Sequence, residues 1–99
     1  MRETIYLTKS TRFDKKFMVI VHGKKIHFGA SGYSDFTKHQ DPARRDRYDQ
    51  RHIRNENWTI TGIATAGFWS KWILWNKKTI AISIKDTEKR FHIRIVNVI

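Results

Sequence analysis

Apolar and polar residues alternate between positions 17 and 28, a pattern typical of a β-hairpin with one buried face. The pair Gly23-Lys24 can form a two-residue turn with glycine at its first central position, which would pair Val21 with Ile26 and Val19 with Phe28. The apolar face then comprises Phe17, Val19, Val21, Ile26 and Phe28, and the opposite face comprises Ile20, His22, Lys25 and His27.

Two further apolar runs extend this pattern. Ile5-Tyr6-Leu7 predicts an N-terminal strand, and residues 91–95 alternate as a strand near the end of the chain. Residues 79–84 fit either a strand or a helix capped by Thr79, and we favour the helix. We therefore expect one small α+β domain over residues 1–99. It would be a three- or four-stranded antiparallel sheet packed by two or three helices.

Residues 41–55 predict a helix with an arginine surface. Asp41 can accept the free amides of the first turn, and Pro42 is tolerated at the first helical position. A helical wheel places Arg44, Arg47, Tyr48, Arg51, Arg54 and Asn55 on one side, and Asp46, Asp49, Gln50 and Ile53 on the other. This helix is segregated by charge and not by hydrophobicity, which favours an anionic partner. The alternative is a solvated surface with intrahelical pairs from Asp41 to Arg45 and from Arg45 to Asp49.

An aromatic segment follows at residues 68–75. Phe68, Trp72 and Trp75 recur at helical spacing, and such a stripe more often forms core than a binding surface. Trp58 and Trp69 are the tryptophans that we expect to be exposed, where they would serve as aromatic anchors for a base or a protein partner.

The chain carries a formal charge of +11 at pH 7, which favours a partner that is anionic. It contains no cysteine, so disulfides and thiolate metal sites are excluded, and this composition suits a reducing compartment. No stretch approaches the roughly 18 apolar residues of a membrane span, and the first residues do not have the pattern of a signal peptide.

Several residues could bind phosphate together. The candidate anion-binding set comprises His39, Arg44, Arg47, Tyr48, Arg51, His52 and Arg54, with Lys24, Lys25, Lys77 and Lys78 as flanking contacts. No sequence motif for metal binding or hydrolysis is present, so we expect no cofactor, no metal and no catalytic residue. The simplest interpretation of His39 is a loop hydrogen bond, and that of His52 is a bond to a backbone carbonyl. Catalysis would require one of these histidines to lie beside a carboxylate or metal in a cleft.

A set of motifs between residues 17 and 91 resembles a known family. They are Phe28-Gly29-x-x-Gly32-Tyr33-x-Asp35, His39-x-Asp41-x-x-Arg44-x-x-Arg47-Tyr48-x-x-Arg51-His52, Asn57-Trp58, Thr65-Ala66-Gly67-Phe68-Trp69-Ser70 and Leu74-Trp75-Asn76-Lys77. Together they are similar to short, basic, uncharacterised proteins encoded by large nucleocytoplasmic DNA viruses of eukaryotes. Lys78 departs from the proline that such sequences tend to have there. The resemblance implies a viral setting and supplies no mechanism.

Two functions follow from these observations. The first is a non-enzymatic protein that binds nucleic acid, DNA more than RNA, through phosphates and without sequence specificity. The second is a minor virion structural protein that bridges acidic surfaces of capsid subunits. An enzyme that acts on phosphodiesters is the least favoured. We expect the protein inside the infected cell and leave its packaging in the particle and its oligomeric state open.

Overall fold

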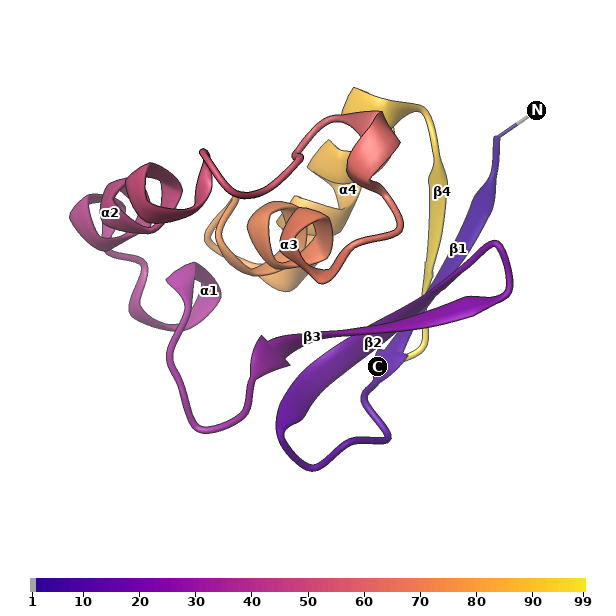
Figure 1. Ribbon diagram of the computed structural model, residues 1–99, viewed down its shortest axis with the longest axis horizontal. Helices are drawn as coiled ribbons and strands as arrows, with labels where there is room; N and C mark the ends of the chain where they lie inside the picture. Colours follow the sequence, from indigo (N-terminus) through magenta and orange to yellow (C-terminus); the bar gives the residue numbers. More distant parts are fainter. Residues whose placement is uncertain (1) are drawn as a thin grey trace.

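Four strands form one mixed sheet in the order β3-β2-β1-β4 in the computed structural model, which describes residues 2–99 (Figure 1). The strands are β1 (Thr4–Lys9), β2 (Lys15–Val21), β3 (Lys24–Ala30) and β4 (Arg94–Asn97). The first three form an antiparallel meander, whereas β4 runs parallel to β1. The α+β class is confirmed, but the expectation of a purely antiparallel sheet is wrong. The helical crossover from β3 returns the chain to the starting end of β1, and this connection gives parallel strands.

The β2–β3 hairpin is confirmed, with a register that differs by two residues from the expected one. Val19 pairs with Ile26, and Phe17 pairs with Phe28. The two turn residues are His22 and Gly23, at φ 52° and 74°, and two positive φ angles are what the favoured hairpin turn with right-handed strand twist requires. Because side chains alternate with period two, a shift of two residues leaves the same residues on the buried face.

Six helical segments connect β3 to β4, and the last three of them pack on one face of the sheet, whereas the first two lie beside the end of β3 (Figure 1). They are α1 (Phe36–His39), α2 (Pro42–His52), η1 (Ile60–Gly62), α3 (Ala66–Trp69), η2 (Ser70–Leu74) and α4 (Ile80–Phe91). Asp41 caps α2 as expected, by accepting from two first-turn amides, but the helix ends at His52 and not near Asn55. Ile53 is exposed and has no core to pack against, so tertiary contacts do not extend the helix.

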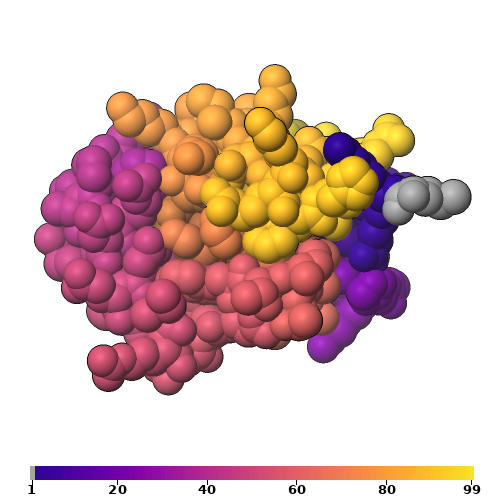
Figure 2. All heavy atoms as spheres, turned by 90° about the horizontal axis from the view of Figure 1, so that it is seen from above, coloured from indigo at the N-terminus to yellow at the C-terminus, as the bar shows by residue number. Residues whose placement is uncertain are grey.

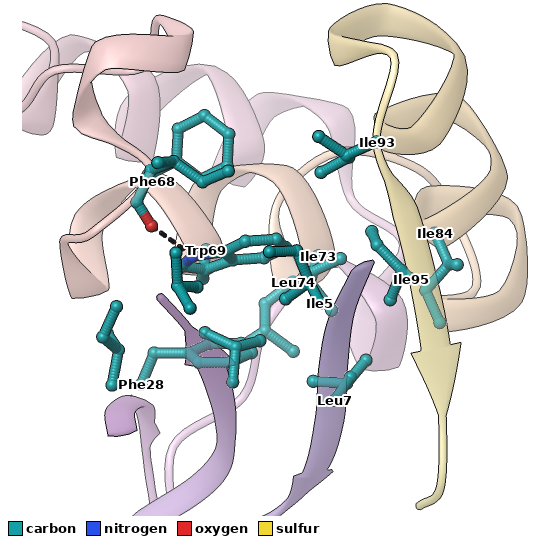
Figure 3. Packing of buried hydrophobic residues seen from close by; sticks show 14 residues of the cluster. Ile5, Leu7, Phe28, Phe68, Trp69, Ile73, Leu74, Ile84, Ile93 and Ile95 are labelled. Atoms are coloured by element: carbon teal, nitrogen blue, oxygen red, sulfur yellow. Dashed lines mark hydrogen bonds between the residues drawn. The ribbon is translucent and has the colours of Figure 1, made fainter. Parts of the chain in front are cut away.

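The core lies between the inner face of the sheet and the α3–η2 segment (Figure 3). Trp69 is fully buried there, and its indole N–H donates to the main-chain oxygen of Ile63 at 2.7 Å. The expectation that Trp69 is exposed is therefore wrong. The segment widens into a π-helical turn in which the amide of Trp75 donates to the oxygen of Ser70. This turn departs from the spacing of the expected helical stripe, and Trp72 and Trp75 are only half-buried.

The last helix and strand resolve the ambiguous C-terminal segment. Thr79 caps α4 by accepting from the amide of Ile82, so the helical interpretation is confirmed. Phe91 belongs to this helix, and His92 ends it in the left-handed conformation at φ 56°. The strand therefore begins at Arg94, later than expected. No helix of residues 2–99 combines the length and apolar character needed to cross a membrane.

Candidate anion-binding cleft

A cleft of about 470 Å³ opens between α2, the end of β3 and the α3–η2 segment. Four members of the predicted anion-binding set line it from α2: Arg44, Tyr48, Arg51 and His52. The opposite wall comes from the start of β2, from residues 28–30 and from residues 33–35. Segments that lie far apart in the sequence, including most of the motifs that carry the family resemblance, thus meet around one cavity.

The carboxylate of Asp35 in this cleft is already neutralised. It lies 2.7 Å from the ammonium of Lys16, and both side chains are nearly buried. Asp35 also accepts hydrogen bonds from the amide and the hydroxyl of Thr37, which fixes it as the cap of α1. Asp35 and Lys16 therefore form a structural pair that adds no net charge to the cleft.

Three other cations line the cleft without a counter-charge. Lys15, Arg44 and Arg51 form neither an ion pair nor a side-chain hydrogen bond with any residue of the described chain, 2–99. Arg44 and Arg51 lie two turns apart on one face of α2, and Lys15 comes from the opposite wall. The cleft is therefore positively charged and suited to an anion.

A stack of aromatic rings holds α2 against the rest of the molecule. The ring of Tyr48 lies parallel to that of Trp75, with centroids 4.3 Å apart, and His52 stacks on Tyr48 at 4.2 Å. His39 and Phe36 continue the contacts beyond Trp75. Such contacts replace the apolar stripe that α2 does not have. The expected position of Tyr48 on an exposed arginine surface is thus wrong, because its side chain is buried.

The hydroxyl of Tyr48 is kept neutral by its surroundings. Burial raises the pKa of Tyr48 well above its usual value, and the nearby carboxylates of Glu56 and Asp49 act in the same direction. The hydroxyl also shares a hydrogen bond with Ser70, another residue that lines the cleft. Tyr48 therefore presents a neutral hydroxyl and not an anion that would repel a negatively charged ligand.

His52 lies beside a carboxylate in the cleft, not beside a backbone carbonyl as expected. Its Nδ1 is 2.9 Å from Oε2 of Glu56, and the indole N–H of Trp58 donates to the other oxygen of Glu56, also at 2.9 Å. This dyad meets the geometric condition that catalysis would require. The described part of the chain contains no cluster of histidine and acidic residues able to hold a metal ion.

Helix α2 also carries unpaired arginines outside the cleft. Arg44, Arg47, Arg51 and Arg54 are all exposed, and none forms an ion pair or side-chain hydrogen bond within residues 2–99. The intrahelical pairs of Arg45 that would have neutralised this surface do not form. Arg45 instead lies over the ring of Phe36 and donates to the main-chain oxygen of Asn76.

The predicted flanking lysines divide into two groups. Lys77 and Lys78 are exposed in the loop before α4, which contacts the α1–α2 region because Gln40 donates to the oxygen of Lys78. Lys24 and Lys25 are at the β2–β3 turn, which lies at the opposite end of the molecule from α2 (Figure 1 and Figure 2). This pair does not line the cleft.

The remaining candidates have structural roles. Nδ1 of His39 accepts from the amide of Asp41, as the loop interpretation expected, and its Nε2 is buried without a partner in the described chain. Trp58 is half-buried, and the ammonium of Lys71 lies 5.1 Å from its ring. Of the two proposed anchors, only Trp58 keeps an accessible surface, since Trp69 is in the core.

Sequence reasoning identified only the α2 residues of the cleft, and the polar residues that it missed include Lys15, Tyr33, Glu56 and Ser70. Tyr33 and Ser70 belong to the motifs that resemble a family, and that signal could have identified them. Lys15 is one lysine in a basic chain, and Glu56 lies outside the helix pattern. Neither carries a local signal.

Comparison with known proteins finds a similarity that covers part of this site. The model of a family of unknown function (DUF5754) matches residues 5–52, which include the sheet meander and α2. The matched region contributes Lys15, Arg44 and Arg51 to the cleft. No curated protein and no solved structure has a significant match.

Proposed function

We propose that this chain is a non-enzymatic nucleic-acid-binding protein of a large DNA virus, which holds phosphates along α2 without sequence specificity. The observation that supports it most is the set of exposed and unpaired arginines at positions 44, 47, 51 and 54. An unpaired guanidinium surface gains free energy from a polyanion, because the polymer releases condensed counterions when its phosphates are neutralised.

The geometry of α2 suits a phosphate backbone. Arg44 and Arg51 are seven residues apart, so the helix separates their Cα atoms by about 10 Å along its axis. That length equals the axial rise of about three base-pair steps, at roughly 3.4 Å each. The arginine surface is therefore long enough to contact more than one phosphate of a duplex.

The exposed arginines favour phosphate contacts over base recognition. None has a neighbour that fixes its guanidinium group, and base recognition needs side chains held in a defined geometry. Unrestrained cations bind the backbone, which carries no sequence information of its own. We assign the His52–Glu56 dyad to packing and orientation, because Glu56 also accepts from the indole N–H of Trp58 and so links α2 to the segment after it.

The experiment is a titration of fluorescent DNA duplex, RNA duplex and single strands of random sequence across a salt series. A variant with Arg44, Arg47, Arg51 and Arg54 changed to glutamine is compared with the unchanged protein. The matched control changes four exposed cations on other elements, Lys9, Lys85, Lys89 and Arg94, to glutamine.

We expect the plot of log affinity against log salt to lose a slope of about 3.6 in the α2 variant, since each of the four neutralised DNA phosphates contributes about 0.9. The control variant should retain most of the slope. Equal losses in both variants would show that only net charge matters and would refute the role of α2. Cleavage of the labelled duplex that disappears in His52→Ala would refute the non-enzymatic assignment.

The second candidate, a minor virion structural protein, has support on the other face of the sheet. The helices leave that face uncovered (Figure 1), and Tyr6, Ile20 and Val96 form an adjacent row on it across three strands. Tyr6 is 48% exposed. An uncovered apolar row of this kind suits contact with another protein. Detection of the protein in purified particles, lost when Tyr6 is changed to lysine, would favour this candidate.

A further inference from the structure

We infer that the cleft binds a nucleoside monophosphate, either free or as the terminal nucleotide of a strand. Its cations would hold the phosphate, and its apolar wall would hold the base. This inference goes beyond the proposed function, because it concerns a small ligand and holds whether or not the exposed surface of α2 binds a polymer.

The charges of the cleft are arranged for a phosphate. Lys15 is half-buried and forms no ion pair in the described chain, and a partly desolvated ammonium is stabilised when an anion approaches it. Arg44 and Arg51 face the same cavity from α2. Three cations from two walls match the roughly two negative charges of a phosphate monoester better than the single charge of a carboxylate.

The cations of the cleft outnumber its acidic residues. Asp35 is paired with Lys16 and accepts from Thr37, and Glu56 accepts from His52 and from Trp58. Asp35 is thus neutralised, and the single charge of Glu56 is outweighed by Lys15, Arg44 and Arg51. The cleft therefore keeps a net positive charge that favours anions even though two carboxylates line it.

The rest of the cleft suits a planar, largely apolar body. Phe28, Leu74 and Trp75 line it, and Tyr33 lies at its rim with 73% of its surface exposed. A base can stack on such an exposed ring, and base–aromatic stacking contributes about 1–3 kcal/mol. The volume of about 470 Å³ lies within the usual range for small-molecule sites. Inorganic phosphate would leave most of this space unfilled.

The first test is calorimetric titration with adenosine 5′-monophosphate, adenosine and inorganic phosphate. We expect the monophosphate to bind more tightly than either part alone. Lys15→Gln should weaken monophosphate binding about tenfold, the loss of one charged contact worth about 1.4 kcal/mol, and leave adenosine unchanged. Tyr33→Ala should weaken the monophosphate and adenosine alike. Lys85→Gln and Phe13→Ala, at exposed positions outside the cleft, should change neither.

A second pair of variants separates the cleft from the helix surface. Arg44→Gln with Arg51→Gln removes two cations that line the cleft, whereas Arg47→Gln with Arg54→Gln removes two that do not. We expect only the first pair to abolish monophosphate binding. Failure of the monophosphate to bind the unchanged protein, or equal binding by both double variants, would overturn the inference.

Oligonucleotides that carry a 5′-phosphate or a 5′-hydroxyl distinguish a free nucleotide from the terminal nucleotide of a strand as the ligand. Tighter binding of the phosphorylated strand, lost in Lys15→Gln, identifies the terminal nucleotide of a strand. Monophosphate binding without this gain identifies a free nucleotide. The Lys15 variant should keep the salt dependence that duplex binding owes to α2, so failure of this inference and failure of the proposed function are distinguishable.

Discussion

Changing Asp49 to asparagine should destabilise the fold by leaving a buried ammonium without its partner. Lys71 is 9% exposed, and its Nζ lies 2.9 Å from each oxygen of Asp49. The rings of Trp58 and Trp72 surround the ammonium at 5.1 and 5.5 Å from their centroids. Asparagine keeps the size of the side chain and one acceptor, and it removes the negative charge.

The exposure of the Asp49 side chain determines how much stability Asp49→Asn should lose. Loss of one partner from a fully buried pair costs about 3–5 kcal/mol. The Asp49 side chain is 31% exposed, so water can replace part of what it supplies, and we expect a loss of about 2 kcal/mol for Asp49→Asn. Lys71→Met removes the buried charge itself and leaves a carboxylate that water can reach. We therefore expect it to cost less than about 1 kcal/mol.

The measurement is urea unfolding followed by circular dichroism, with thermal unfolding alongside it. A loss of about 2 kcal/mol corresponds to a fall in Tm of roughly 8–16 °C for a domain of this size. Asp46→Asn is the control, because Asp46 is an exposed carboxylate of the same helix without a partner in the described chain, and its change should stay within about 0.5 kcal/mol. A cost for Lys71→Met equal to or above that of Asp49→Asn would refute the reasoning.

Three further outcomes are expected. Gly29→Ala should cost about 3 kcal/mol and Gly32→Ala about 1 in urea unfolding, since both have positive φ but only at Gly29 would the new methyl lie 2.7 Å from a Leu74 side-chain atom. A smaller loss at Gly29 than at Gly32 would contradict that contact. Burial raises the pKa of Tyr48 above the value near 10 of the unfolded chain, so its contribution to stability is present below pH 10 and is lost as the pH rises above it. Tyr48→Phe should thus lose less stability than the unchanged protein between pH 9 and 11 in urea titrations, and identical pH profiles would argue against it. Trp69→Phe should cost about 2–3 kcal/mol, because it removes a buried hydrogen bond and leaves a void, and thermal unfolding would detect this.

The elements that the sequence predicted best are those with a local signal. The alternation of residues 17–28 identified the hairpin and its buried face, and the Asp41-Pro42 pair identified the start of α2. The turn was placed one residue late because His22, and not only Gly23, adopts a positive φ. A histidine in that conformation has no strong sequence signature.

The features that sequence reasoning missed depend on contacts between distant residues. The parallel pairing of β4 with β1 depends on the path of the helical crossover, and the burial of Trp69 depends on the packing of α3 against the sheet. Both are tertiary effects that local patterns do not encode. For the site, the arginines were predicted from their clustering, whereas Lys15 and Glu56 reach the cleft only through the fold.

Because β1 pairs with β4, the hydrogen bonds along one edge of β1 can form only after the last strand of the chain is present. Ile5 pairs with Ile95, so this contact closes a loop of about the whole chain, and β1 remains an open sheet edge until Arg94–Asn97 has been synthesised. A growing chain can form the β1–β2–β3 meander early, but the edge of β1 that later pairs with β4 is then free to pair with another chain. Chains truncated before Arg94 should therefore aggregate through β1, and a charged substitution at the outward-facing Thr4 should suppress that aggregation in light-scattering measurements.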